Sequence, residues 1–169
     1  MLHSIVTCRS IAISYPSGDP NKRLLLSDEP IAPARSALMA KVGPRDTKPE
    51  MIVRRILHAL GRRFRLHRRD LPGTPDIVLP AARKAIFVHG CFWHRHEGCP
   101  KATIPKTRVD FWLDKFARNI ERDRRKEHEL RDAGWDVLTV WECETRHPLV
   151  LKITLRDWLG RTGSHFGCR

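Results

Sequence analysis

Two cysteines, three histidines and two large aromatic residues lie within the eleven residues from His89 to Cys99. Zinc binds thiolate sulfur and imidazole nitrogen in a tetrahedron, and closely spaced ligands let a short loop surround the ion with little loss of chain entropy. Cys91, His96 and Cys99 have that spacing, and Cys143 is the natural fourth ligand. The segment predicts a structural zinc site; a loop without metal and a buried free thiol at Cys143 are the alternative.

His89 and His94 flank the expected metal loop without belonging to its ligand set. A histidine side chain titrates near neutral pH, so either residue could transfer a proton during hydrolysis. Supporting a metal ligand, or simply packing, is an equally common role for a histidine. Residue type alone leaves these roles open for both.

Asp76 follows a turn at residues 71–75 (LPGTP) and begins a short apolar run, residues 76–79, that predicts a strand. Residues 84–88 predict a second strand, which ends beside His89. An aspartate after a turn is common for conformational reasons alone. At the start of one strand, near the histidine-bearing end of its neighbour, a carboxylate is also suited to Mg²⁺, which would polarise a scissile phosphate.

Three aromatic residues, Phe92, Trp93 and Trp112, stand beside polar or basic residues and outside the periodic apolar runs. Core packing is the ordinary role of any one of them. As a group on a basic surface they could instead wedge between base pairs, which kinks DNA at a cost of a few kcal/mol per unstacked step. A mismatched step unstacks more easily, so such a wedge would favour mismatches.

The helix and strand that precede Asp76 have local sequence signals. Residues 47–50 (TKPE) combine a capping threonine, an early proline and a glutamate, which predicts a helix start, and Gly61 predicts its end. Residues 62–69 alternate basic and apolar side chains. We therefore expect an exposed strand there, with a charged face that is either solvated or in contact with phosphates.

Residues 111–133 predict a long helix, although Glu127 interrupts its apolar stripe. The inner side of this helix is expected to carry Leu113, Phe116, Ile120 and Leu130. Residues 135–141 predict a further strand, and residues 148–159 predict a closing helix that begins at a proline. The order of elements predicts a single α/β (α+β) domain with a small mixed central sheet flanked by helices.

Proline-rich residues 1–35 lack a sustained apolar period, so we expect an irregular or disordered N-terminal extension. Residues 36–160 would form the domain, and residues 161–169 a flexible tail. The chain has no apolar run of about 18 residues that could span a membrane, and residues 1–13 do not resemble a signal peptide. An odd set of five cysteines suits a reducing cytosol better than a disulfide framework.

The chain carries 32 Lys and Arg residues against 19 Asp and Glu residues, a formal net charge of +13. Such an excess favours a polyanionic partner, because bound phosphates release their counterions. Nucleic acid is the first expectation. Basic proteins of the ribosome or the membrane surface share this charge, so the chemistry must be inferred from other residues.

Six stretches, in this order, resemble the very short patch repair endonucleases, the Vsr type. They are residues 45–50 (RDTKPE), 71–76 (LPGTPD), 87–94 (FVHGCFWH), 111–115 (FWLDK), 119–123 (NIERD) and 134–143, which begin GW and end VWEC. The resemblance covers roughly residues 36–147. The string HGCFWH together with the distant WEC is more specific than any single motif.

This resemblance implies a fold related to type II restriction endonucleases and a magnesium-dependent DNA endonuclease. It implies that one strand is nicked 5′ of the thymine in a T·G mismatch, which arises when 5-methylcytosine deaminates. The implied partner is double-stranded DNA with that mismatch, and mismatch-repair proteins are further candidates. The protein would act as a monomer in the bacterial cytoplasm, at the nucleoid.

The resemblance also assigns roles to individual residues. Asp76 would bind Mg²⁺ together with the backbone carbonyl of Val88, and His94 would be the general base, supported by His89 and Glu50. The implied zinc ligands are Cys91, His96, Cys99 and Cys143. The implied DNA contacts are the wedge residues Phe92, Trp93 and Trp112, with Lys115 and Asn119.

Two other functions fit the same motifs. A zinc-stabilised module could bind distorted DNA without cutting it, and such a module would need no role for Asp76. A nuclease of the restriction type could use the same chemistry on another target. Nicking assays on mismatched and fully paired DNA distinguish these functions.

Overall fold

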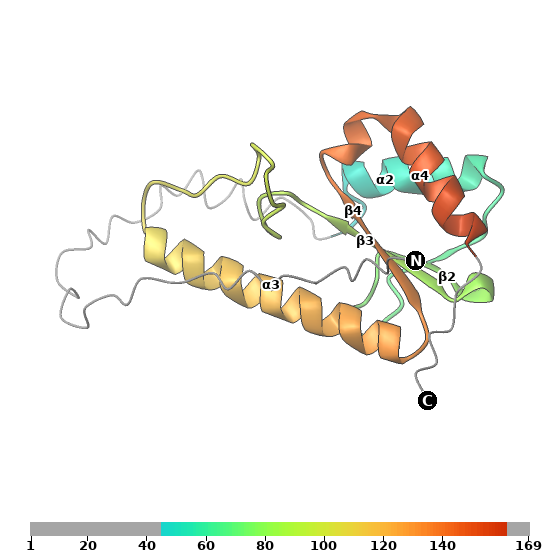
Figure 1. The fold of residues 1–169 in the computed structure, drawn as a ribbon, viewed down its shortest axis with the longest axis horizontal. Coiled ribbons are helices and arrows are strands. Elements are labelled where there is room, and N and C mark those ends of the chain that lie inside the picture. Colours follow the sequence, from blue (N-terminus) through green and yellow to red (C-terminus); the bar gives the residue numbers. More distant parts are fainter. Residues whose placement is uncertain (1–44, 162–169) are drawn as a thin grey trace, which may run out of the picture. The chain divides into compact units, whose positions relative to one another are not determined.

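The structure, a computed structural model, describes residues 45–161 (Figure 1). Its elements are α2 (Lys48–Ala59), β1 (Arg65–Leu66), β2 (Ile77–Leu79), β3 (Lys84–His89), α3 (Val109–Asp132), β4 (Asp136–Trp141) and α4 (Pro148–Gly160), with short 3-10 turns at Pro80–Ala82 and Glu144–Arg146. The expected extension, residues 1–35, and the expected tail beyond residue 161 lie outside the described residues. None of the helices described here is long and apolar enough to cross a membrane.

The four strands form one mixed sheet in the order β1-β2-β3-β4. β2 runs antiparallel to β1 and to β3, whereas β3 and β4 are parallel. A parallel pair needs a crossover, and α3 supplies it. The register pairs His89 with Trp141, so β3 and β4 end at the same edge of the sheet. This arrangement confirms the expected α+β domain with a small mixed sheet.

Helices cover both faces of the sheet, as Figure 1 shows, with α2 and α4 side by side on one face and α3 on the other. Side chains alternate along β3, so Ile86 and Val88 pack toward α2 and α4, while Ala85 and Phe87 pack toward α3. The larger core includes Val53, Leu57, Ile77, Ile86, Val140, Leu155 and Trp158. Both apolar faces of the sheet are therefore buried.

The expected capping box begins α2. The Thr47 hydroxyl accepts a hydrogen bond from the backbone N–H of Glu50, and the Glu50 carboxylate accepts one from the N–H of Thr47. Together these bonds satisfy two backbone donors that a helix start leaves free. The box also fixes Glu50, which is only 3% exposed, beneath the first turn of the helix.

β1 is shorter than the strand expected over residues 62–69, since only Arg65 and Leu66 pair with β2. The next residue, His67, has a φ angle of +46°, in the left-handed region. An extended strand cannot continue through that conformation. β1 therefore ends at Leu66, and the expectation of an exposed strand over residues 62–69 was wrong.

The long helix is confirmed as α3, but its apolar stripe is not as expected. Phe116 and Leu130 are buried, whereas Leu113 is 45% exposed. A helix of 24 residues spans about 36 Å, and a strand of six residues spans about 20 Å, so α3 extends beyond the sheet. Glu127, which interrupts the apolar stripe, faces β4, where its carboxylate accepts a hydrogen bond of 2.8 Å from the Thr139 hydroxyl.

Gly73 lies in the turn that precedes Asp76 and has a φ angle of +77°. A Cβ atom there would lie 3.0 Å from Cζ of Phe87 and 3.1 Å from Cβ of Lys126. We expect Gly73→Ala to lower the free energy of unfolding by about 2–4 kcal/mol, combining the left-handed backbone with overpacking. Urea unfolding monitored by circular dichroism measures this.

Gly61 provides the matched control. Its φ angle is +68°, but a Cβ atom there would meet nothing within 4 Å. Gly61→Ala should therefore lose only the backbone contribution, about 1–2 kcal/mol. Equal losses in the two variants would contradict a close approach of the turn to Phe87 and α3.

Candidate active site and metal centre

The chemistry-bearing residues gather at one edge of the sheet. His89 is the last residue of β3, and Cys143 follows the end of β4, its parallel neighbour. Asp76 directly precedes β2, which is antiparallel to β3, so the start of β2 lies level with the end of β3. Residues far apart in the sequence are thus brought together by strand pairing.

Asp76 is held by the neighbouring strand. Its Oδ2 atom accepts a hydrogen bond of 2.8 Å from the backbone N–H of Val88. In an antiparallel pair the N–H and the C=O of a residue face the same neighbour, so the Val88 carbonyl also faces the Asp76 side. A carboxylate and a carbonyl are hard oxygen ligands of the kind that Mg²⁺ prefers.

Burial raises the pKa of the Asp76 carboxyl to about 6, although the Val88 N–H opposes this shift. The negative charge of Glu50 adds to the rise, and His67 and Arg54 counteract it. A carboxyl whose pKa is perturbed by burial is a common feature of functional sites. At neutral pH the ionised carboxylate is therefore destabilised unless a cation lies close to it.

His89 and His94 form a stacked pair, with ring centroids 3.9 Å apart and an angle of 8° between the rings. His94 Nδ1 lies 2.5 Å from Oδ2 of Asp123. A carboxylate only accepts, so Nδ1 carries the proton and Nε2 keeps its lone pair. His94 can therefore accept a proton at Nε2 while Asp123 stabilises the resulting positive charge.

Burial, reinforced by the adjacent His94 ring, lowers the pKa of His89 to about 4. His89 is consequently neutral at neutral pH, which allows its close stacking with a ring that gains charge. Burial by itself raises the pKa of Asp123, but the hydrogen bond and positive charge of His94 bring it below its ordinary value. Of the two stacked histidines, His94 is therefore the one whose ring nitrogen faces a carboxylate.

Strand register places Asp76 on the same face as these histidines. Ile77 pairs with Ile86, so one further step puts Asp76 opposite Phe87. Phe87 and His89 share the face of the sheet that α3 covers, and their rings lie 5.7 Å apart. The carboxylate and the histidine pair therefore lie on one side of the sheet edge.

Asp123 was quoted in the sequence motif but received no expected role. The signal that could have identified it is helical spacing, since Lys115, Asn119 and Asp123 stand at positions i, i+4 and i+8 of α3. The Asn119 amide donates to the carbonyl of Trp93 at 3.2 Å, and the Lys115 ammonium lies 5.2 Å from the Trp93 ring. This face of α3 therefore faces the loop after β3.

Glu50 lies in a different group from the one expected. Its carboxylate pairs with Arg54 at 2.8 Å, and Arg54 also pairs with Asp46 at 2.6 Å. His67 lies between this group and Asp76. The contacts of Glu50 thus connect it to Asp76 through His67, and not to His94. The other members of this group, Asp46, Arg54 and His67, had no role expected from the sequence.

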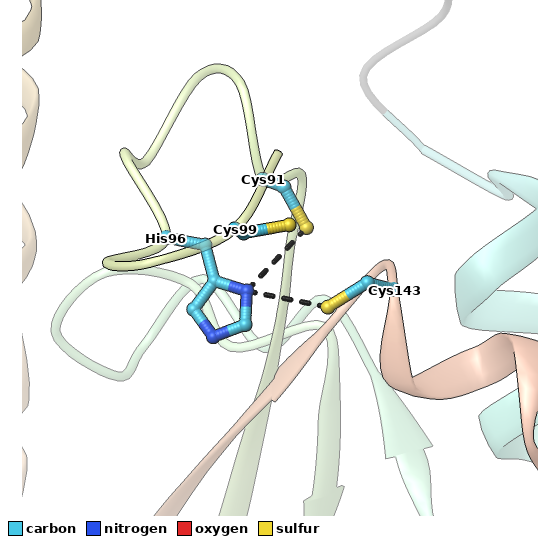
Figure 2. A group of neighbouring side chains, drawn as sticks. All are labelled: Cys91, His96, Cys99 and Cys143. Atoms are coloured by element: carbon cyan, nitrogen blue, oxygen red, sulfur yellow. Dashed lines mark hydrogen bonds between the residues drawn. The ribbon is translucent and has the colours of Figure 1, made fainter. Parts of the chain in front are cut away.

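The four expected zinc ligands come together in the structure, as Figure 2 shows. The loop after β3 contributes Cys91, His96 and Cys99, and Cys143 approaches from the end of β4. His96 Nδ1 lies 3.7 Å from the Cys91 sulfur and 3.2 Å from the Cys143 sulfur. All four ligand atoms lie within 4.8 Å of one another.

This cysteine cluster, defined as Cys91, His96, Cys99 and Cys143, fits a tetrahedral metal ion. Zinc–sulfur and zinc–nitrogen bonds place ligand atoms roughly 3.5–3.8 Å apart, close to the separations seen here. Burial raises the pKa of the Cys91 thiol to about 12, so it stays protonated unless a cation stabilises the thiolate. The His96 ring also stacks on Trp141, with centroids 4.2 Å apart, which holds its orientation.

The three aromatic residues expected to contact DNA form one half-buried cluster. The Phe92 ring lies 5.0 Å from Trp93 and 5.7 Å from Trp112, and it also packs on Phe116 of α3. The ammonium of Lys115 lies 5.4 Å from the Trp112 ring, a favourable cation–π distance. A positive charge and an aromatic surface therefore meet where the loop packs on α3.

Comparison with known proteins identifies the family. The profile described as "DNA mismatch endonuclease Vsr" matches residues 28–101. The type II nicking enzyme V.XorIIP of Xanthomonas oryzae pv. oryzae is 51% identical over 125 residues, which cover 74% of this chain and 91% of that enzyme. This chain belongs to the Vsr family.

Two further relatives of the Vsr-family chain come from other bacteria. The DNA mismatch endonuclease Vsr of Escherichia coli is 46% identical over 112 residues, covering 66% of this chain and 71% of that protein. The type II nicking enzyme V.NmeAIP of Neisseria meningitidis is 43% identical over 118 residues, covering 70% and 84%. The expected Vsr resemblance is confirmed, and with it a DNA endonuclease.

Charge burial at Asp76 should reduce the stability of the Vsr-family fold. The ordinary carboxyl pKa is 3.8, and the folded value is about 6, so the folded state binds more protons and loses stability as pH rises through this window. At pH 8 without added Mg²⁺, Asp76→Asn should therefore be more stable than wild type by roughly 1–3 kcal/mol. The gain should shrink as pH falls from about 6 toward 3.8.

Urea unfolding at several pH values measures this difference. Asp157→Asn is the control, because the Asp157 side chain is 61% exposed on α4. The control should show no gain that depends on pH. An Asp76→Asn variant that is less stable than wild type at pH 8 would contradict a buried, destabilised carboxylate.

Proposed function

We propose that this protein nicks one strand of double-stranded DNA on the 5′ side of the thymine in a T·G mismatch, which initiates very short patch repair. Membership of the Vsr family supports this function, as do the names of relatives that are mismatch endonucleases or nicking enzymes. The observation that carries it is the hydrogen-bonded pair of His94 and Asp123, on the same side of the sheet edge as Asp76.

Asp76 and the carbonyl of Val88 are the groups that would hold Mg²⁺. Their oxygen donors and the destabilised charge on Asp76 fit a hard divalent cation. When bound, Mg²⁺ polarises the scissile phosphate and stabilises the negative charge that develops on it. The Val88 N–H keeps the carboxylate fixed through Oδ2, which leaves Oδ1 for the cation.

His94 is the proposed general base. Its free Nε2 takes a proton from the attacking water, and the Asp123 carboxylate at Nδ1 stabilises the imidazolium that forms. His89 stays neutral and holds the His94 ring by stacking on it. These residues supply proton transfer and orientation, which the bound cation does not provide.

Recognition of the mismatch is assigned to the aromatic cluster with Lys115 and Asn119. Phe92, Trp93 and Trp112 would wedge into the DNA at the weakly stacked T·G step. Lys115 and Asn119 share one face of α3 with Asp123. Groups that contact DNA and the partner of the general base therefore lie on the same rigid element.

A DNA-binding module without catalysis would need neither Asp76 nor the His94–Asp123 hydrogen bond. A metal-binding carboxylate and an oriented histidine on one side of the sheet edge therefore favour the enzyme over the binding module. A nuclease with another target would keep these residues, so its distinction from a mismatch nickase depends on the substrate.

Nicking of a duplex with a single T·G pair, in the presence of Mg²⁺, tests the function. Wild type should cut 5′ of the thymine, Asp76→Asn should abolish cutting, and His94→Ala should slow it by about 100- to 10,000-fold, the usual contribution of a general base. Both variants should still bind the duplex in a gel-shift assay.

Asp157→Asn serves again as the control and should nick as wild type does. Binding without nicking by wild type would support the DNA-binding module. Equal nicking of T·G and fully paired DNA would support a nuclease of the restriction type. Either outcome contradicts the proposed mismatch nickase.

We propose further that the cysteine cluster holds one structural Zn²⁺ ion. It would attach the loop after β3 to the end of β4, and thereby position His94 and the aromatic cluster. Structural zinc sites contribute directly to folding free energy. In a structural zinc site all four ligands are protein side chains, whereas a catalytic zinc site leaves one position for water.

Elemental analysis should find one zinc per chain in wild type and much less in Cys143→Ser. The variant should also unfold at a lower temperature, because an unfilled cluster leaves the loop unattached. Cys8→Ser, at a cysteine outside the cluster, is the control and should keep its zinc. Undiminished zinc in Cys143→Ser would remove Cys143 from the ligand set.

A further inference from the structure

The His67 side chain lies between the Glu50–Arg54 ion pair and the Asp76 carboxylate. Its Nε2 atom lies 3.2 Å from Nη2 of Arg54 and 3.7 Å from Oε2 of Glu50. On the opposite side of the ring, Nδ1 lies 3.9 Å from Oδ1 of Asp76. The ring therefore stands between the Glu50–Arg54 ion pair and the candidate Mg²⁺ ligand.

The partner at Nε2 determines the tautomer of His67. A guanidinium group only donates hydrogen bonds, so Nε2 must present its lone pair to Arg54. The ring proton is then on Nδ1, where it faces the carboxylate of Asp76. Arg54 is itself fixed by Glu50 and by Asp46, so the tautomer follows from a network of charged groups.

His67 faces the oxygen of Asp76 that the strand does not hold. Oδ2 is bonded to the N–H of Val88, so Oδ1 is the atom available to a cation. A separation of 3.9 Å exceeds a hydrogen bond but lies within the range at which an N–H dipole favours a carboxylate. Val88 and His67 thus flank the carboxylate from two sides.

The backbone of His67 is adapted to this position. Its N–H donates to the backbone carbonyl of Asp76 at 3.3 Å, and its φ angle of +46° turns the chain out of β1 at this residue. Such a left-handed conformation is unfavourable for a non-glycine residue. The side chain is only 16% exposed, so the ring is held in place between α2 and the site.

We propose that His67 is a positioning residue for the nicking reaction, which orients the Oδ1 atom of Asp76 for the divalent cation through an N–H whose direction Arg54 sets. This inference rests on the proposed function. His67 would act through Asp76, since its polar side-chain contacts are with Asp76, Glu50 and Arg54. Partners that orient a metal ligand typically change metal affinity by about 10- to 100-fold when they are removed.

Two substitutions of similar size separate this role from packing. His67→Leu fills the space but removes both ring nitrogens, whereas His67→Gln keeps one donor and one acceptor. Mn²⁺ binding to the full-length protein, followed by electron paramagnetic resonance without DNA, is the first readout. His67→Leu should need about 10- to 100-fold more Mn²⁺ for half-saturation, and His67→Gln should recover most of that loss.

Nicking of the T·G duplex at increasing Mg²⁺ concentration is the second readout. The Mg²⁺ concentration for half-maximal rate should rise for His67→Leu, while the affinity for the duplex stays at the wild-type value. His58→Leu is the control, because His58 is an exposed residue of α2 that packs edge-on against Phe64. Thermal unfolding of every variant shows whether a loss comes from stability, and His67→Ala replaces His67→Leu if that variant does not fold.

Wild-type Mn²⁺ affinity in His67→Leu would overturn the inference, as would an equal loss in His67→Gln and His67→Leu. Absence of Mn²⁺ binding by wild type would overturn it too. Failure of wild type to nick any T·G duplex would instead refute the proposed function, and the Mn²⁺ comparison would still decide the role of His67 at Asp76.

Discussion

Parallel pairing of β3 with β4 is the constraint on which both sites depend. It aligns His89 with Trp141, so the loop that leaves β3 begins beside the point where β4 ends. That loop carries Cys91, His96 and Cys99, and the segment after β4 begins with Glu142 and Cys143. A shift of this register would separate the cysteine cluster and displace His94 from Asp123 on α3.

The buried position of Asp76, the proposed Mg²⁺ ligand, disfavours its ionised form. Apolar side chains pack on both faces of the sheet. Burial of Asp76 at the edge of this sheet makes its ionised form unfavourable. The strand N–H of Val88 offsets part of that cost, as do His67 and Arg54, while Glu50 adds to it. The fold thus holds the Asp76 carboxylate in an unfavourable charged state, which a divalent cation would stabilise. Such a cost in stability is common at functional sites.

Local signals were sufficient to predict several parts of the fold and part of the cysteine cluster. The capping box at Thr47, the helix end near Gly61 and the ligand spacing from Cys91 to Cys99 all depend on residues close in sequence. The pairing of Asp123 with His94 and the network around His67 depend on tertiary contacts, which no local pattern encodes. Leu113 is exposed because α3 is longer than the sheet that it covers. The spacing of apolar residues along the helix does not show how far the helix extends beyond the sheet.

One face of α3 contacts both the proposed DNA-binding residue Trp93 and the proposed general base His94. Lys115, Asn119 and Asp123 are spaced four residues apart, so they follow one face of the helix at intervals of about 6 Å. The first two contact Trp93, and the third binds His94 in the same loop. If this loop moved to insert its aromatic residues into DNA, it would either break its contacts with α3 or move together with the helix. In the proposed reaction, retention of the His94–Asp123 hydrogen bond would require that the aromatic residues enter the DNA together with α3. Engagement of a weakly stacked step would then also align the proposed general base.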